Sequence, residues 1–287
     1  MNNKFYSTHR TALGKISDFL RYAVLSAISL FAVFPFLWMF LSALKTKDEL
    51  MRVEQLLPQV PQWENFSTIL FDSPIPSYMT NSLLVAVAVV VLQVVTGAML
   101  AYALVFFDFK GKNLLFAIIM GIYMLPSAVT YIPGYIILSE MNLLNKLTGI
   151  IISSTVSIFG IFLLRTGFMQ VPKGLVEAAR MDGASHFRIL WEIVCPVSKS
   201  SFITFGLMSF ISTYNSYMWP FLITNDSNKF LVSQGLRSFL IEGGAYGTKW
   251  NLVMAASAVI VLPLLVLFAF TQKWFINGIG GDTGMKG

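Results

Sequence analysis

Long apolar runs separated by short polar stretches make up most of the sequence. A helix needs roughly 20 mostly apolar residues to cross the hydrocarbon core of a bilayer. The runs are continuous, whereas the strands of a membrane β-barrel alternate apolar and polar residues. The sequence therefore predicts an all-α polytopic membrane protein whose six transmembrane helices lie at about Phe19–Leu44, Tyr78–Phe106, Leu114–Leu138, Thr148–Phe168, Ser201–Thr224 and Asn251–Phe275.

The composition agrees with this pattern. Of the 287 residues, 56% are hydrophobic and 12% are charged, and the mean hydropathy is +0.70, which is far too apolar for a soluble domain. The first apolar run is longer than the core of a cleaved secretory signal, so we expect it to be retained as a span. We divide the chain into an N-terminal arm (1–18), a six-helix domain (19–275) with an inner loop at about 169–200, and a C-terminal tail (276–287).

The charged residues are distributed unequally between the two sides of the predicted membrane domain. If the N-terminus lies inside, thirteen of the twenty Lys and Arg residues fall on the inner side, and eight of the fourteen acidic residues fall on the outer side. This asymmetry follows the positive-inside rule and predicts that both termini are cytoplasmic. The formal net charge of +6 is therefore a topology signal, and we do not expect nucleic-acid binding.

Ionisable side chains are missing from the middle of the predicted spans, and neither His9 nor His186 falls in one. A carrier driven by protons or sodium usually needs an intramembrane carboxylate or histidine. The energy for transport must then come from elsewhere, or the protein conducts passively. The sequence contains no recognisable catalytic or metal-ligand set, and a single cysteine, Cys195, cannot form an intrachain disulfide.

Two stretches combine prolines with polar and aromatic residues inside or near the spans, one around Pro126 and Pro133 and one before Trp219 and Pro220. In hydrocarbon, each polar group must find a partner on a neighbouring helix or in a water- or solute-filled cavity. Helix-packing contacts explain a single Ser or Thr at least as well as a pore does, but the clusters favour a pore lining. Aromatic faces with amide and hydroxyl groups would suit a sugar, and the candidate pathway residues are Tyr131, Tyr135, Ser212, Tyr214, Asn215 and Tyr217.

A polar inner loop, QVPKGLVEAARMDGASHFRILWEIVCPVSKS, lies between the fourth and fifth predicted spans. Pro172 suits a first helical position, and Leu175–Met181 has the pattern of a short helix that Gly183 ends. Ser185 is a suitable N-cap for a second helix that ends before Pro196. The loop is therefore predicted to be two short helices joined by a glycine turn at the membrane surface.

The spacing EAA, three residues, Gly183, nine residues, Ile193, one residue, Cys195-Pro196 resembles the EAA loop of importer permeases of the ATP-binding-cassette superfamily. The family has leucine where this chain has Cys195, an exchange between apolar side chains. In that family the loop docks into a groove of a separate ATPase subunit. The resemblance therefore assigns coupling to Glu177, Ala178, Ala179, Asp182 and Gly183.

Weaker motifs over nearly the whole chain, among them SALKTKDEL, MLPSAVTYIPGY and TYNSYMWPFLIT, look like the shorter permease of the maltose and glycerol-phosphate importers. The resemblance implies a bacterial inner-membrane permease, not an enzyme, that forms half of a pathway for a sugar, by family frequency an oligosaccharide. The implied partners are a second homologous permease, two ATPase subunits that bind the ATP, an extracytoplasmic solute-binding protein and the bilayer. No cofactor is expected on this chain, which has no phosphate-binding loop of its own. A passive channel or secondary carrier is the alternative, and a membrane enzyme comes third.

Overall fold

The structure, a computed structural model, describes residues 12–52, 54–242 and 249–279. Within these ranges all regular structure is helical. Three helices are long and apolar enough to cross a membrane unbroken, α1 (Ala12–Ala43), α4 (Ile75–Phe106) and α16 (Trp250–Ile279). Three further candidate spans are helix pairs with a sharp bend, so the described chain holds up to six. The predicted fold class is confirmed.

Two of the bent pairs differ from the continuous helices expected for the third and fourth spans. The axes of α5 (Lys112–Tyr123) and α6 (Ala128–Glu140) differ by 99°, and those of α7 (Leu147–Ser153) and α8 (Ile158–Phe168) by 46°. The α5–α6 break contains Pro126, which lacks an N–H and disfavours a helical conformation at the preceding residue. At the α7–α8 break, the Ser157 side chain accepts a hydrogen bond from the Gly160 N–H and caps α8, which starts a new helix there.

The prediction of the fifth span, Ser201–Thr224, is wrong at its C-terminal end. The helix α12 covers Lys199–Tyr214, and α13 (Met218–Ile223) is a separate short helix. The Asn215 side chain donates to the carbonyl oxygen of Ile211 at 2.9 Å. This bond satisfies a carbonyl group of the last turn of α12, which Asn215 follows.

The limits of the first and last helices also differ from the prediction. The first helix begins at Ala12, so part of the predicted arm 1–18 is helical, and the last helix runs to Ile279, beyond the predicted end at 275. The remainder of the arm and tail, residues 1–11 and 280–287, lies outside the described residues.

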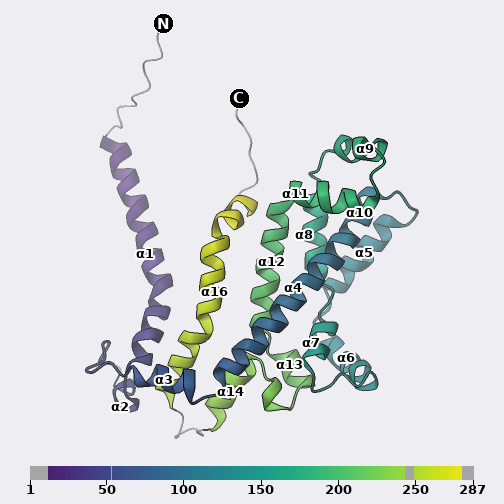
Figure 1. The fold of residues 1–287 in the computed structure, drawn as a ribbon. Helices are drawn as coiled ribbons and strands as arrows, with labels where there is room; N and C mark the ends of the chain where they lie inside the picture. Colours follow the sequence, from purple (N-terminus) through teal and green to yellow (C-terminus); the bar gives the residue numbers. More distant parts are fainter. Residues whose placement is uncertain (1–11, 53, 243–248, 280–287) are drawn as a thin grey trace.

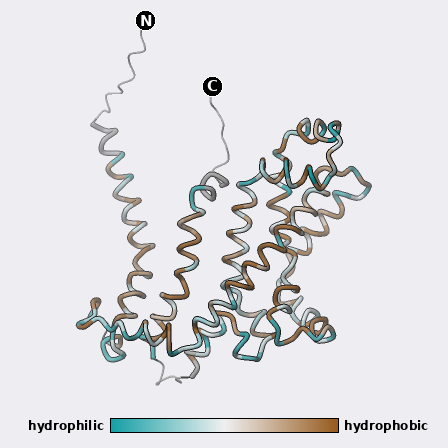
Figure 2. The backbone as a smooth tube through the Cα atoms, in the orientation of Figure 1, coloured by the Kyte–Doolittle hydropathy of each residue, from teal (hydrophilic) through white to brown (hydrophobic). Residues whose placement is uncertain are grey.

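The helices form an open layer with two polar ends (Figures 1 and 2). One end carries α9 (Lys173–Met181), α10 (His186–Ile189) and α11 (Cys195–Val197), together with the first turn of α1 and the last turns of α16. The other end carries α2 (Lys47–Leu50), α3 (Glu64–Phe71), α13 and α14 (Val232–Glu242). We call these the α9 end and the α3 end.

Small residues let the central helices approach closely around α4. A Cβ atom added at Gly160 of α8 would lie 2.1 Å from Cζ of Phe205 on α12, and one added at Gly167 would lie 2.3 Å from Oγ of Ser201. Ala98 and Ala101 of α4 belong to the same buried cluster. In a bilayer, where lipid is as apolar as leucine, such close backbone contact is a main source of helix association.

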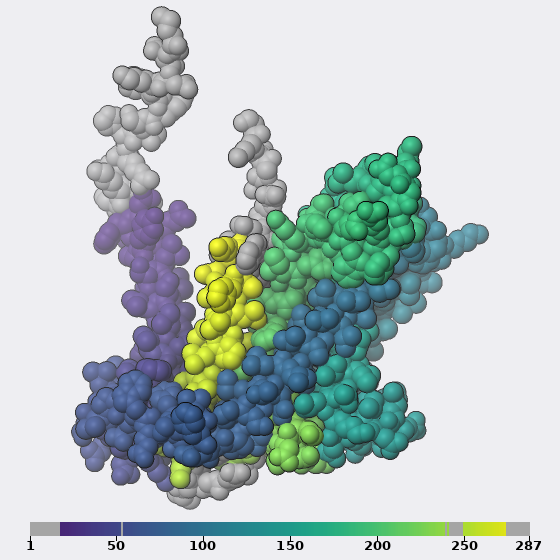
Figure 3. Space-filling model, in the orientation of Figure 1, coloured from purple at the N-terminus to yellow at the C-terminus, as the bar shows by residue number. Residues whose placement is uncertain are grey.

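The helix α1 contributes little to this core. None of its most apolar window is buried, and Phe31 is 83% exposed. The half of α1 nearer α2 lies against α16, whereas its other half stands clear of the body (Figure 3). A long apolar helix with this exposure has to be covered by lipid or by another membrane subunit.

Candidate functional site

A pocket of about 420 Å³ lies between the central helices where two spans are broken. Tyr123, the last residue of α5, and Ser157, the N-cap of α8, both contribute to its wall. Gln93, near the middle of α4, also lines it. The remaining lining residues are Phe159 from α8 and Phe205, Met208, Ser209, Ser212 and Thr213 from α12. We call this the central pocket, and its lining is polar and aromatic without a charged side chain.

Gln93 connects three of the surrounding segments. Its Nε2 donates to the Ser154 carbonyl oxygen at 2.7 Å, and its Oε1 accepts from the Ser209 hydroxyl at 2.7 Å. One turn further along α4, the Thr96 hydroxyl donates to the Thr155 carbonyl oxygen at 2.9 Å. These bonds satisfy carbonyl groups that the α7–α8 break releases, as non-helical backbone at membrane depth requires. Sequence reasoning missed Gln93, although a lone amide in the apolar run 83–95 was a usable signal.

The predicted pathway residues do not form one cluster. Ser212 lines the central pocket. Tyr214 is fully buried, and its hydroxyl donates to the Ile260 carbonyl oxygen at 3.1 Å. In this structure Tyr214 is therefore a packing residue between α12 and α16, which corrects the prediction that it faces solute.

Tyr131 and Tyr135 lie on α6 and belong to a second group. The Tyr131 ring stacks on Trp219 of α13, with ring centroids 5.7 Å apart. The Trp219 indole N–H in turn donates to the Ser153 hydroxyl of α7 at 2.8 Å. Tyr135 is 43% exposed and Tyr131 is half-buried, so Tyr135 is the more accessible of the two.

Asn215 and Tyr217 lie toward α14, at the α3 end. Asn215 is exposed, and its carbonyl oxygen accepts from the Ser233 hydroxyl at 3.2 Å. The Tyr217 hydroxyl accepts from the Arg237 guanidinium, which also lies 4.5 Å from the centre of the Phe221 ring. Tyr217, Ser233 and Arg237 line a separate open hollow. Neither Asn215 nor Tyr217 lines the central pocket, although both are close to Ser212 in the sequence.

The inner loop forms two short helices around a glycine turn, as predicted, with shifted limits. The first helix begins at Lys173, two residues before the predicted Leu175, and Pro172 precedes it. Ser185 caps the second helix by accepting from the Arg188 N–H, as predicted. That helix does not end before Pro196, because a π-helical segment (Leu190–Val194) leads into α11. A widened turn of this kind can accommodate a position without a backbone donor.

Gly183 has a left-handed backbone with φ of +78°. Its N–H donates to the Arg180 carbonyl oxygen at 3.0 Å, and the Ala184 N–H donates to the Ala179 carbonyl oxygen at 3.0 Å. This pair of bonds is the Schellman arrangement that ends a helix on glycine. The motif glycine is therefore the helix stop of α9.

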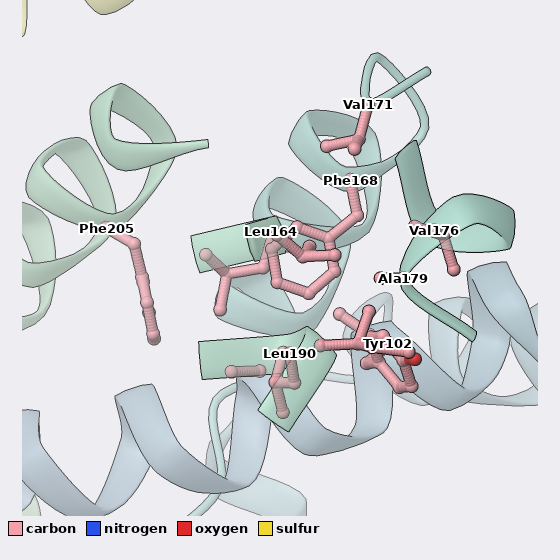
Figure 4. Packing of buried hydrophobic residues seen from close by; sticks show 12 residues of the cluster. Tyr102, Leu164, Phe168, Val171, Val176, Ala179, Leu190 and Phe205 are labelled. Carbon is pink, nitrogen blue, oxygen red and sulfur yellow. The ribbon is translucent and has the colours of Figure 1, made fainter. Parts of the chain in front are cut away.

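The two faces of α9 have different surroundings. Val176 and Ala179 are buried against Tyr102 and Phe168 of the same chain (Figure 4). Ala179 is therefore an internal contact, which corrects its prediction as a docking residue. The opposite face exposes the motif residues Glu177, Ala178, Asp182 and Gly183.

The sequence analysis did not identify several exposed apolar side chains at the α9 end. Met181 is 89% exposed, Phe187 65% and Leu175 47%. Leu175, Ala178 and Met181 recur every three residues and therefore share one side of the helix. That spacing was the signal that could have found them. We call Leu175, Ala178, Met181 and Phe187 the exposed loop face.

The loop is fixed to the end of α4. The Tyr102 hydroxyl lies 3.1 Å from Nδ1 of His186, and the His186 and Phe107 rings pack edge to face with their centroids 4.7 Å apart. A guanidinium nitrogen of Arg180 lies 3.4 Å from the same His186 nitrogen. These contacts, together with buried Val176 and Ala179, allow α9 and α4 to move as one body.

Comparison with known proteins places this architecture in a family. The model of a family described as "Binding-protein-dependent transport system inner membrane component" matches residues 93–280. The sn-glycerol-3-phosphate transport system permease protein UgpE of Yersinia pestis bv. Antiqua (strain Antiqua) is 34% identical over 257 residues, which cover 87% of this chain and 91% of that protein. The arabinooligosaccharides transport system permease protein AraQ of Bacillus subtilis (strain 168) is 31% identical over 264 residues, covering 90% and 92%.

A solved structure has the same fold. It is a bacterial ABC transporter involved in the import of the acidic polysaccharide alginate, and one of its chains superposes with a TM-score of 0.80 at 23% identity. The superposition covers 95% of this chain and 100% of that chain. At this identity the match supports the fold rather than a shared solute.

Proposed function

We propose that this chain, which belongs to the family of binding-protein-dependent transport system inner membrane components, is a permease subunit of a bacterial ATP-driven sugar importer. It forms one half of the translocation pathway and carries out no reaction itself. The relatives described above are named as transport permeases.

The observation that carries this proposal is the central pocket at the breaks in the spans. Discontinuous helices near the middle of the membrane commonly form substrate sites in transporters, because unwound backbone is tolerated only beside a cavity or buried in protein. The pocket offers aromatic rings, hydroxyls and one amide, without a cation or carboxylate. This lining suits a neutral saccharide, with C–H faces and many hydroxyls, better than a phosphorylated polyol.

The relatives' names point to both kinds of solute. UgpE is named for sn-glycerol-3-phosphate and AraQ for arabinooligosaccharides. The uncharged lining favours the oligosaccharide class for this chain. Of the predicted pathway residues, Ser212 has the strongest support, and Tyr135, Asn215 and Tyr217 are assigned to other stretches of the route.

The exposed loop face and the motif residues Glu177, Asp182 and Gly183 are proposed to dock a separate ATPase. The sequence has no phosphate-binding loop of its own, so ATP and its magnesium would bind on that partner. Closure of the ATPase pair would push the rigid loop, and the contacts to α4 would pass the movement to the spans. The α9 end is then cytoplasmic, together with both termini.

Further partners follow from the family and from the exposed surface. The apolar exposure of α1 supports a second permease packed beside it in the bilayer. Two ATPase subunits would match two permeases, one for each loop. A binding protein would deliver the sugar to the α3 end, and such a protein is bound in a solved alginate transporter.

Reconstitution tests this proposal. The chain is placed in liposomes with its cognate permease, ATPase and binding protein, and ATP hydrolysis is measured against neutral oligosaccharides, monosaccharides and polyol phosphates. We expect a neutral oligosaccharide to stimulate hydrolysis only when the binding protein is present. Uptake should stop on ATP depletion and persist with an ionophore, whereas uptake that collapses with the ionophore would support the secondary-carrier alternative.

Filling the central pocket should block passage without removing a structural hydrogen bond. Ser212→Phe adds a ring at an exposed wall position, and we expect transport of the stimulating sugar to fall about tenfold or more, equivalent to at least about 1.4 kcal/mol. Thr166→Phe, at an exposed position of α8 outside the pocket, is the control. It loses one local hydrogen bond to the Phe162 carbonyl oxygen and should still transport normally. Equal transport by both variants would show that the central pocket is not part of the pathway.

A further inference from the structure

Three basic residues converge on a hollow at the α9 end that the transport proposal does not use. This hollow, about 220 Å³ in volume, lies between the last turn of α4, the start of α5, the end of α8 and the root of α9. Lys112, Arg165 and Lys173 line it, and the rest of its wall is apolar, including Phe106, Phe168 and Met169. No acidic side chain belongs to its lining. We call it the basic hollow.

Arg165 is the central cation of the three. Its guanidinium lies 4.0 Å from the centre of the Phe116 ring, which supports one face of the group. Its Nε is buried and has no hydrogen-bond partner within the described chain. An unpaired buried donor typically costs about 1–3 kcal/mol. Protein atoms cover this N–H, so an acceptor would have to enter the hollow to reach it, and would then remove that cost.

The other two cations flank the entrance. The Lys112 amine donates to the carbonyl oxygens of Val105 and Phe107, at 3.2 and 2.8 Å, and is thereby held in place. The nearest acid is Asp108, 3.8 Å from the amine, and its side chain is fully exposed. Such a solvated pair neutralises little charge. Lys173 is exposed on the first turn of α9 and has no acidic partner in the part of the chain that the structure describes.

The start of α5 adds to the positive potential. Lys112 is its first residue, after Gly111 with φ of +87°, and no side chain caps the helix. The unpaired N–H groups of this twelve-residue helix face an adjoining hollow lined by residues 108–114, which shares Lys112 with the basic hollow. A helix N-terminus favours negative charge, and here it lies beside three cations.

We propose that the basic hollow binds a phosphate group, and that the source is the headgroup of an anionic phospholipid. Arginine and lysine donors with an unpaired N–H provide the recognition chemistry for a phosphate. The apolar wall and the exposed rings of Phe107 and Phe109 indicate a position at the membrane interface, where a lipid presents its headgroup beside its acyl chains. Free phosphate has no acyl chain and would make no favourable contact with the apolar wall of the hollow.

The position of the hollow gives the lipid a mechanical role. Lys173 begins α9, Arg165 lies near the end of α8 and Lys112 begins α5. One headgroup bound to all three would tie the root of the loop to two transmembrane segments. This inference requires only that the chain is embedded in a bilayer, so it stands independently of the transported solute.

Lipid retention tests the proposal. The assembled transporter, purified with its cognate subunits in detergent, is loaded with phosphatidylglycerol or phosphatidylcholine, and retained lipid is counted by native mass spectrometry. We expect phosphatidylglycerol to be retained about tenfold better, and the double variant Arg165→Gln/Lys173→Gln to lose that preference. The control Arg188→Gln/Lys199→Gln removes two cations from the same end but outside the hollow, and should keep it.

Other outcomes overturn the proposal or part of it. Equal retention of the two lipids by the unmodified transporter, or an unchanged preference in the double variant, would overturn the site. Displacement of phosphatidylglycerol by inorganic phosphate would keep the phosphate chemistry but replace the lipid source with a soluble one. If the double variant fails to assemble, the single change Lys173→Gln, at an exposed position, is measured instead, and it should reduce the preference severalfold.

Discussion

Met181→Asp is expected to release the ATPase from this permease. Met181 is 89% exposed at the tip of the loop, where an unbranched, polarisable side chain suits insertion into a groove. An aspartate there would bury an unpaired charge at the interface, which is expensive. Truncating a hot-spot residue of an interface costs about 2 kcal/mol or more. If Met181 is such a residue, ATPase binding should weaken by at least about thirtyfold.

Pull-down of the ATPase by the permease pair in detergent measures this effect. Met51→Asp is the matched control, because Met51 is 60% exposed at the α3 end, beside α2, where no ATPase should bind. Normal ATPase capture by the Met181→Asp permease would show that the exposed loop face is not the docking surface. Equal loss in both variants would instead indicate a general folding defect.

Gly183→Val is expected to separate ATP hydrolysis from transport. Nothing lies within 4 Å of a Cβ atom added at Gly183, so the cost is not a collision. The cost comes from the left-handed backbone, with φ of +78°. This conformation is unfavourable by about 1–2 kcal/mol for a residue with a side chain, and by more for a β-branched residue such as valine. The turn would abandon the two Schellman hydrogen bonds and change the angle between α9 and α10. We expect transport to fall roughly 5- to 30-fold, the factor that corresponds to 1–2 kcal/mol.

Two further substitutions distinguish conformation from side-chain size. Gly183→Asn should retain most transport, because asparagine tolerates the left-handed region better than other residues. Gly174→Val places the same side chain in open space on the same helix, where the backbone is right-handed, and should have a small effect. If valine is as harmless at position 183 as at 174, the helix stop has no part in coupling.

The number and approximate position of the spans could be predicted from the sequence alone. Six apolar runs of membrane-crossing length leave few alternatives, because every backbone group in a bilayer must be satisfied within helices or a closed barrel. The two short helices and the glycine turn of the inner loop could also be predicted from the sequence. Ser185 as an N-cap and Gly183 as a helix stop are local effects that depend on a few neighbouring residues.

Which face of each helix meets which neighbour was decided only by the tertiary structure. In water, a buried face is apolar and an exposed face polar, but in a bilayer both faces are apolar, so hydropathy carries little information about packing. Tyr214 could therefore face a pore or the core, and only its contact with Ile260 on α16 shows that it is buried. Ala179 and Met181 lie two residues apart in the same motif, yet one packs inside and the other projects outward. Gln93 acquires its role from the carbonyl group of Ser154, about sixty residues away in the sequence, which the helix break brings beside it.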